Sequence, residues 1–184
     1  IDNRYVCSLC YPDLVYQNHI IESSKIHLIN QLEKVGFLGL SNNIPVILLD
    51  KSKLLELSET AYHKNLKGFT KITKKNNGSD NQYIIYILNN LHQIEFDAVL
   101  AHEYLHVWQN NQNIKLDDAD SEGLSNLASE LIYKNYNNTF SRILNNSLNN
   151  DNTIYGDGYR KMKNIKDQIG WERLIKEIMI NYSY

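Results

Sequence analysis

The sequence predicts an α+β domain in which a small mixed sheet comes first and a helical half follows. Short apolar segments bounded by Gly, Pro and Asn lie in the first half of the chain, as is typical of strands. The second half instead repeats apolar residues at helical spacing. One helix of that half carries two histidines four residues apart, His102 and His106, and this pair is the most informative feature of the chain.

The first half alternates helical and extended patterns. Apolar residues between Val15 and Leu32 recur at helical spacing, and Gly36 ends that pattern. The apolar run after Pro45 is short enough for a buried strand. We therefore expect helices over residues 14–35 and 52–62 and strands over residues 45–50, 68–73 and 82–88, with an Asn-Gly turn at residues 76–78 before the last strand.

The second half predicts only helices. Residues 94–110 carry an apolar stripe that includes Phe96, Leu100 and Trp108. A second amphipathic helix begins near Glu122 and can pack against the first. We expect further helices over residues 140–148, 159–168 and 171–180, with a polar linker over residues 149–152.

The two histidines form a metal-binding pattern with the glutamate between them. Residues four apart lie on one face of a helix, so the imidazoles of His102 and His106 can bind one zinc ion. Glu103 then lies beside the metal as a base.

A catalytic zinc needs a third protein ligand and an open fourth position. Glu122 is the candidate, because a ligand near the start of a helix can point into a cleft. Glu130 is the rival, but it falls about two turns later on the same helix.

Four segments together resemble one peptidase family. Residues 99–108, 121–123 and 155–160 resemble the peptidase domain of the DA-one family, the ubiquitin-activated zinc peptidases that limit organ growth in plants. The opening residues 2–10 resemble the end of the LIM-like zinc module that precedes that domain. One position departs from the pattern, since Ser121 stands where the family usually carries an acidic residue.

This resemblance implies a fold, a domain division and partners. It places the chain in the gluzincin branch of zinc peptidases, with a zincin-like fold, and assigns residues 1–12 to a remnant of the LIM-like module and residues 13–184 to the peptidase domain. It implies a protein or peptide substrate, and ubiquitin or a ubiquitinated protein as a further partner. In zincins the strand before the motif helix commonly forms the sheet edge that pairs with substrate, which suggests residues 83–87 here, with a plain core strand as the alternative.

The expected chemistry assigns a role to each remaining site residue. Zinc acts as a Lewis acid on a water molecule, and Glu103 takes its proton and delivers it to the leaving amine. The oxyanion that forms needs a second donor, for which Tyr155 and Tyr159 are candidates. Asp157 is a candidate to orient a ligating histidine.

The segment that carries these three residues also contains two glycines. Gly156 and Gly158 permit unusual backbone shapes and a close approach to the cleft. The alternative is a helix-entry turn whose tyrosines pack in the core.

Cys7 and Cys10 form a Cys-x-x-Cys pair. Two such thiolates suit one zinc, but a structural zinc site uses four ligands, so the pair is half a site. The resemblance implies that the other half lay upstream, and a redox pair is the alternative.

Composition excludes several classes of partner. The chain has 184 residues and a formal net charge of −2, which gives no basic surface for nucleic acid or anionic membrane. No apolar run reaches the roughly 18 residues that a spanning helix needs, and the sequence opens at Ile1 without the basic and apolar pattern of a leader, so we expect a cytoplasmic protein.

Together these patterns predict a zinc-dependent endopeptidase. Two alternatives stay open: a protein-binding module that keeps the fold without activity, and a zinc aminopeptidase, which would need an acidic anchor for the substrate amine.

Overall fold

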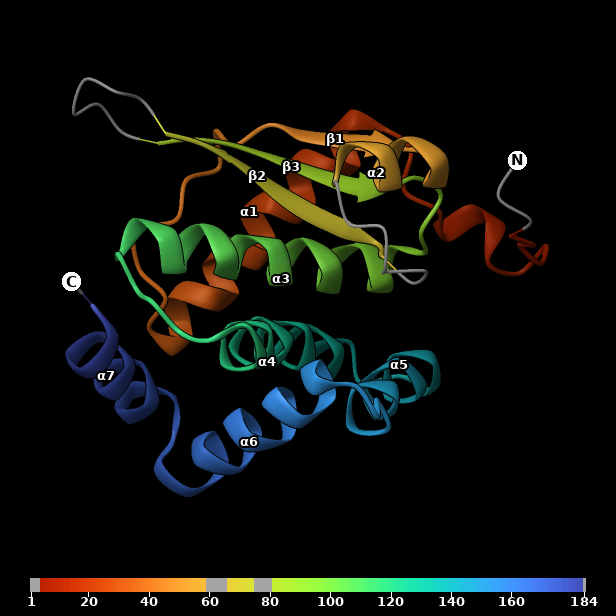
Figure 1. The fold of residues 1–184 in the computed structure, drawn as a ribbon. Coiled ribbons are helices and arrows are strands. Elements are labelled where there is room, and N and C mark those ends of the chain that lie inside the picture. The colour runs from red at the N-terminus through yellow and green to blue at the C-terminus, as the bar shows by residue number, and fades with distance from the viewer. Residues whose placement is uncertain (1–3, 59–65, 75–80, 184) are drawn as a thin grey trace.

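The computed structural model describes residues 4–58, 66–74 and 81–183, which form strands and helices in the predicted order (Figure 1). The strands are β1 (Val46–Leu49), β2 (Gly68–Thr73) and β3 (Gln82–Leu88). The helices are the 3-10 turn η1 (Tyr11–Asp13), α1 (Asn18–Val35), α2 (Lys51–Leu57), α3 (Gln93–Asn111), α4 (Asp118–Tyr136), α5 (Thr139–Asn149), α6 (Ile154–Ile169) and α7 (Trp171–Tyr182). The predicted α+β class is confirmed.

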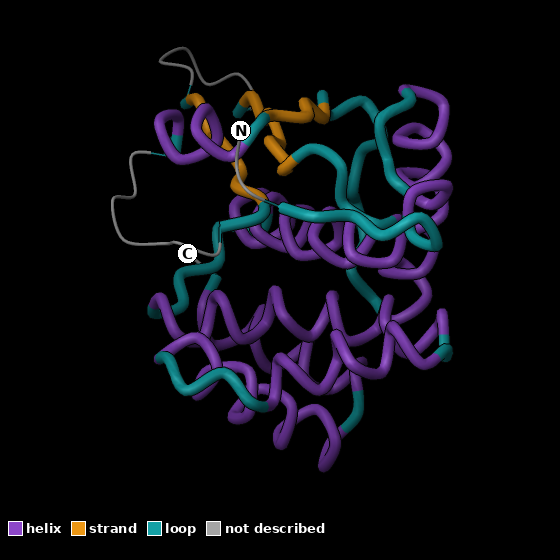
Figure 2. The backbone as a smooth tube through the Cα atoms, turned by 90° about the vertical axis from the view of Figure 1, so that its right-hand side faces the viewer, coloured by secondary structure: helices purple, strands orange, loops and turns teal. Residues whose placement is uncertain are grey.

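The elements stack in layers beneath the sheet. The sheet lies on α3, α4 lies under α3, and α6 lies under α4, while α1 runs behind α3 (Figure 1). The view at right angles shows the same order, with the strands at one end of the molecule and the helices filling the other (Figure 2). Helix α3 is therefore covered by the sheet on one side and by α4 on the other.

The sheet has β3 at its centre. Its order is β1-β3-β2, with β1 parallel and β2 antiparallel to β3. The expectation that residues 83–87 form a substrate-binding edge is therefore wrong, because β3 has a hydrogen-bonded strand on each side. Among the described residues, the strands with an unpaired edge are β1 and β2.

Helix α3 is buried in the hydrophobic core of the domain. Ile85 and Ile87 of β3 are fully buried in the core to which this helix contributes. On the helix itself Tyr104 and Trp108 are buried, and the ring of Trp108 meets that of Phe37 edge-on at 4.9 Å between centroids. Each large apolar side chain buried in this way contributes about 2 kcal/mol, so α3 is held in one position and rotation.

Helices α4 and α6 make close backbone contact through two glycines. A Cβ on Gly123 would lie 2.4 Å from the carbonyl carbon of Gly158, and a Cβ on Gly158 would lie 1.9 Å from the Ala119 carbonyl oxygen. Gly158 and Gly156 lie inside α6, which begins five residues earlier than predicted. Gly158 therefore permits close helix packing, and the expected unusual backbone shape is wrong here.

Other element boundaries agree with the prediction to within a few residues. Helix α4 begins before Glu122 because the side chain of Asp117 accepts a hydrogen bond from the Asp120 N–H at 2.8 Å and caps the helix. The end of the helix predicted over residues 52–62 and the turn at residues 76–78 fall outside the described residues. Within the described part of the chain, we find no helix long and apolar enough to cross a membrane.

The α4–α6 contact predicts a large cost for a single methyl group. We expect Gly158→Ala to lower the free energy of unfolding by about 3 kcal/mol, because the added Cβ meets backbone, which cannot rotate away. Urea denaturation measures this change. Gly39→Ala is the comparison: it has positive φ but open space around it, so we expect a loss of only about 1 kcal/mol. Equal losses in the two variants would contradict the packing role of Gly158.

Candidate metal centre

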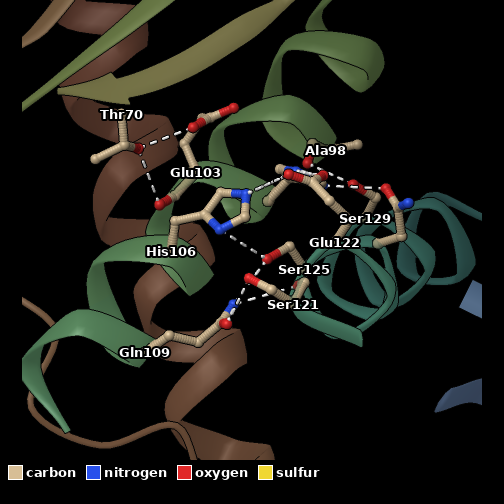
Figure 3. Close-up of polar contacts among 11 residues, drawn as sticks. Thr70, Ala98, Glu103, His106, Gln109, Ser121, Glu122, Ser125 and Ser129 are labelled. Atoms are coloured by element: carbon tan, nitrogen blue, oxygen red, sulfur yellow. Dashed lines mark hydrogen bonds and ion pairs between the residues drawn. The ribbon is translucent and has the colours of Figure 1, made fainter. Parts of the chain in front are cut away.

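Two histidines from α3, His102 and His106, and one glutamate from α4, Glu122, each offer a ligand atom within 4.8 Å of the other two. Figure 3 shows His106 and Glu122 of this group. His102 Nε2 lies 3.1 Å from His106 Nε2 and 3.1 Å from Glu122 Oε2, and His106 Nε2 lies 3.4 Å from Glu122 Oε1. Zinc bound tetrahedrally at ligand distances of about 2.1 Å needs ligand atoms roughly 3.4 Å apart. The two histidines approach different oxygens of the Glu122 carboxylate, and these separations are close to that spacing, so the three side chains could hold a zinc ion.

The helix packing explains why Glu122 and not Glu130 joins the histidines. Glu122 lies in the second turn of α4, on the face toward α3. Glu130 is buried farther along and forms ion pairs with Lys134 of the same helix, at 2.8 Å, and with Lys166 of α6. These ion pairs, one within α4 and one to α6, hold the Glu130 carboxylate away from the histidines.

Each histidine is oriented by a residue of α4. His102 Nδ1 lies 3.0 Å from Asn126 Oδ1, an acceptor, so Nδ1 carries the proton and Nε2 presents its lone pair to the centre. His106 Nδ1 lies 3.4 Å from Ser125 Oγ. Sequence reasoning missed both partners, although Ser125 and Asn126 follow Glu122 by one helical turn and so share its face.

Asp157 does not orient either histidine, and that expectation is wrong. It is 75% exposed and pairs with Arg160 one turn along α6 at 2.5 Å. Arg160 also donates to the carbonyls of Asn149 and Asp151, both at 2.7 Å, and so ties α6 to the end of α5.

A buried glutamine joins α3 to α4 beside the ligands. Gln109 donates to Ser125 Oγ at 3.0 Å and to the Ser121 carbonyl at 3.3 Å, and its own Oε1 accepts from Ser121 Oγ at 2.8 Å (Figure 3). Ser121 is the neighbour of Glu122, and Ser125 contacts His106. We refer to Gln109, Ser121 and Ser125 as the polar clamp.

The charges of the centre favour a positive ion in its middle. Burial raises the pKa of Glu122, but hydrogen bonds and charges from His102 and His106 together hold this pKa well below its ordinary value. Burial lowers the pKa of His102, yet Glu122, with smaller contributions from Glu103 and Asn126, brings it above its ordinary value. A proton shared by His102, His106 and Glu122 occupies the place where a metal ion would bind, so a metal ion that binds there displaces the proton.

Glu103 lies beside the ligands in a different environment. Its side chain is buried, and burial raises its pKa although the two histidines and Thr70 act in the opposite direction. Thr70 Oγ1 donates to Glu103 Oε2 at 2.8 Å (Figure 3). A carboxylate whose pKa is raised accepts a proton more readily than an ordinary glutamate does.

The two tyrosines of α6 occupy different places. Tyr155 is half-buried, and burial, then the negative charges of Glu122 and Asp118, raise its pKa. It lies one turn before Gly158, through which α6 contacts the first turn of α4. Tyr159 is fully buried, and after burial the main influence on its pKa is Glu130. Tyr159 therefore cannot meet a substrate, and its proposed catalytic role is wrong; the core alternative holds for it.

Cys7 and Cys10 lie apart from this centre, before η1. Their Sγ atoms are 3.4 Å apart, and the Cys10 thiol lowers the pKa of Cys7. In the described part of the chain, no further His, Cys, Asp or Glu forms a three-ligand group with them. Metal binding by Cys7 and Cys10 stays a prediction, with a redox pair as the alternative.

Comparison of the chain with protein-family models, curated proteins and solved structures finds no match.

The geometry predicts which glutamate binds the metal. Glu122→Ala should lose most of the zinc measured by atomic absorption after dialysis, because it removes one of three ligands. Glu130→Gln is the matched control on the same helix and should retain zinc, although it weakens a buried ion pair. Full zinc occupancy in Glu122→Ala would refute the assignment.

The polar clamp predicts an effect on metal affinity without loss of a ligand. We expect Gln109→Leu to weaken zinc binding about tenfold in competition with a chromophoric chelator, because Ser121 and Ser125 lose the partner that holds them near Glu122 and His106. Gln112→Leu, at the C-terminal end of the same helix, should bind zinc as the wild type does. Equal affinity in all three proteins would show that the clamp only stabilises the fold.

Proposed function

We propose that the protein is a zinc-dependent endopeptidase of the gluzincin type, with a zincin-like fold. The observation that supports this most is the donor triangle of His102, His106 and Glu122, with the buried carboxyl group of Glu103 beside it. The resemblance to the DA-one family supports the same activity, and ubiquitin as a partner depends on that resemblance alone.

The residues of the chain divide the chemistry between them. Zinc, when bound, supplies a Lewis acid that lowers the pKa of water and polarises a carbonyl group. His102, His106 and Glu122 would hold the ion, and Glu103 would accept the proton of the attacking water and pass it to the leaving amine. Its raised pKa suits both transfers, since a strongly acidic carboxylate would not accept a proton readily.

Strand β2 offers an edge for an extended peptide. The Lys67 carbonyl accepts from the Leu88 N–H at 2.8 Å, so the odd-numbered residues of β2 pair with β3. The even-numbered residues, Gly68, Thr70 and Ile72, therefore direct their N–H and C=O groups away from β3. A substrate main chain can add to this edge as a further strand, and because β2 contacts α3 at Glu103, the substrate would pass beside the centre.

Tyr155 is the proposed second donor to the oxyanion. It is the half-buried tyrosine of α6, and its phenol, whose ordinary pKa is about 10, is protonated at neutral pH, as a donor requires. Burial and the charge of Glu122 raise this pKa further.

An aminopeptidase is the second candidate. Asp118 lies one turn before Glu122 on α4, and its charge acts on Tyr155, so a carboxylate is available near the centre for a substrate amine. Mass analysis of products separates the two activities: internal cleavage of an N-terminally acetylated peptide supports the endopeptidase, and release of single residues from free N-termini only supports the aminopeptidase.

The proton-transfer role predicts a selective loss of activity. Glu103→Gln keeps the size of the side chain but removes the base, so cleavage of an unfolded protein substrate should fall about 10²-fold or more. Zinc content and the unfolding curve should remain near those of the wild type. Cleavage at the wild-type rate in this variant would favour a protein-binding module without its own activity.

A further inference from the structure

Thr70 reaches from the sheet to the carboxyl group of Glu103. Its hydroxyl lies 2.8 Å from Glu103 Oε2 and 3.2 Å from the backbone carbonyl of the same residue. A hydroxyl has one hydrogen to donate, and the shorter distance assigns it to the carboxylate. Thr70 is half-buried and Glu103 is only 4% exposed, so water competes poorly for this hydrogen bond.

Gly68 brings the same strand against the other carboxylate oxygen. A Cβ at this position would lie 3.0 Å from Glu103 Oε1 and 2.7 Å from Val99 Cγ1. The absence of a side chain thus lets β2 approach α3 closely enough for Thr70 to make its contact. The two residues together leave the Glu103 carboxylate little freedom to rotate.

The arrangement places two tasks on one short segment. The side chain of Thr70 faces α3 and holds Glu103, while its backbone groups point away from β3, to an edge with which no other described strand pairs. A peptide that adds to this edge is then aligned by the same residue that aligns the base. Such alignment matters because small displacements of a reacting group cost large factors in rate.

We propose that Thr70 is a positioning residue that holds the Glu103 carboxylate in the orientation needed for proton transfer, on the strand that receives the substrate. This proposal rests on the proposed peptidase function. Its role differs from that of the metal ligands: among the described residues, both hydrogen-bond contacts of the Thr70 hydroxyl are with Glu103 and none is with a metal ligand, so Thr70 should not affect zinc binding.

Substitutions at Thr70 test this role in the full chain loaded with zinc. Thr70→Val keeps the shape but removes the hydroxyl, and we expect kcat on an acetylated peptide to fall about tenfold, with KM changed less than about twofold. Thr70→Ser restores the hydroxyl and should recover kcat to within about threefold of the wild type. Thr139→Val makes the same chemical change at an exposed position of α5, outside the proposed substrate strand, and should leave both constants unchanged. Wild-type kcat in Thr70→Val, or no recovery in Thr70→Ser, overturns the proposal.

A double-mutant cycle in urea unfolding tests the contact without any activity. Thr70→Val should raise the unfolding equilibrium constant about tenfold in the wild-type background, because it leaves a buried carboxyl group without its donor, and less than about threefold in a Glu103→Leu background. Equal effects in the two backgrounds overturn the proposed contact. If the contact is present but the zinc-loaded wild type cleaves no peptide, the peptidase function fails and the role of Thr70 in catalysis falls with it. If the wild type is active and only the kinetic expectation fails, the peptidase function stands and Thr70 is structural.

Discussion

The close packing of α4 along α3 is the contact on which the rest of the structure depends. The ligands come from these two helices, so their separation and rotation set every distance in the centre. Small and polar residues of α4 make the approach possible: Ser129 donates to the Ala98 carbonyl at 2.9 Å, and the polar clamp ties the other end. Because Gly123 and Gly158 have no side chains, α6 packs closely against α4 on the side opposite α3.

The same packing gives the two central carboxyl groups opposite properties. Glu122 faces two imidazoles and has its pKa held low, which suits a metal ligand. Glu103 faces the sheet, where burial raises its pKa and Thr70 supplies a single hydrogen bond, which suits a group that gains and loses a proton. The proposed roles of Glu122 as ligand and Glu103 as base therefore follow from the different surroundings of the two carboxyl groups.

Local patterns predicted the features that depend on neighbours in sequence. The spacing of His102 and His106 on an amphipathic helix is local, and α3 forms where that pattern requires. Glu122 was preferred over Glu130 from its position in the helix, and the donor triangle includes Glu122. Glu130 instead forms an ion pair with Lys166 of α6, and the sequence does not reveal how α6 packs against α4.

Features set by contacts between distant segments were predicted poorly. Strand β3, which precedes α3, was expected at the edge of the sheet. Strand order depends on pairing between segments distant in sequence, and β3 lies between β2 and β1, to which it is parallel. Asp157 and Tyr159 were placed at the centre, whereas the pitch of α6 turns one to solvent and the other into the core. Asn126 could have been found, since it shares the helix face of Glu122.

The coordination of bound zinc tests the central claim most directly. Zinc K-edge X-ray absorption of the protein loaded with less than one equivalent of zinc reports the ligand elements and distances. The donor triangle predicts nitrogen and oxygen ligands at about 2.0–2.1 Å, with scattering from two imidazole rings and no sulfur. A shell of sulfur at about 2.3 Å would place the zinc at Cys7 and Cys10 instead and would contradict the assignment of the metal centre.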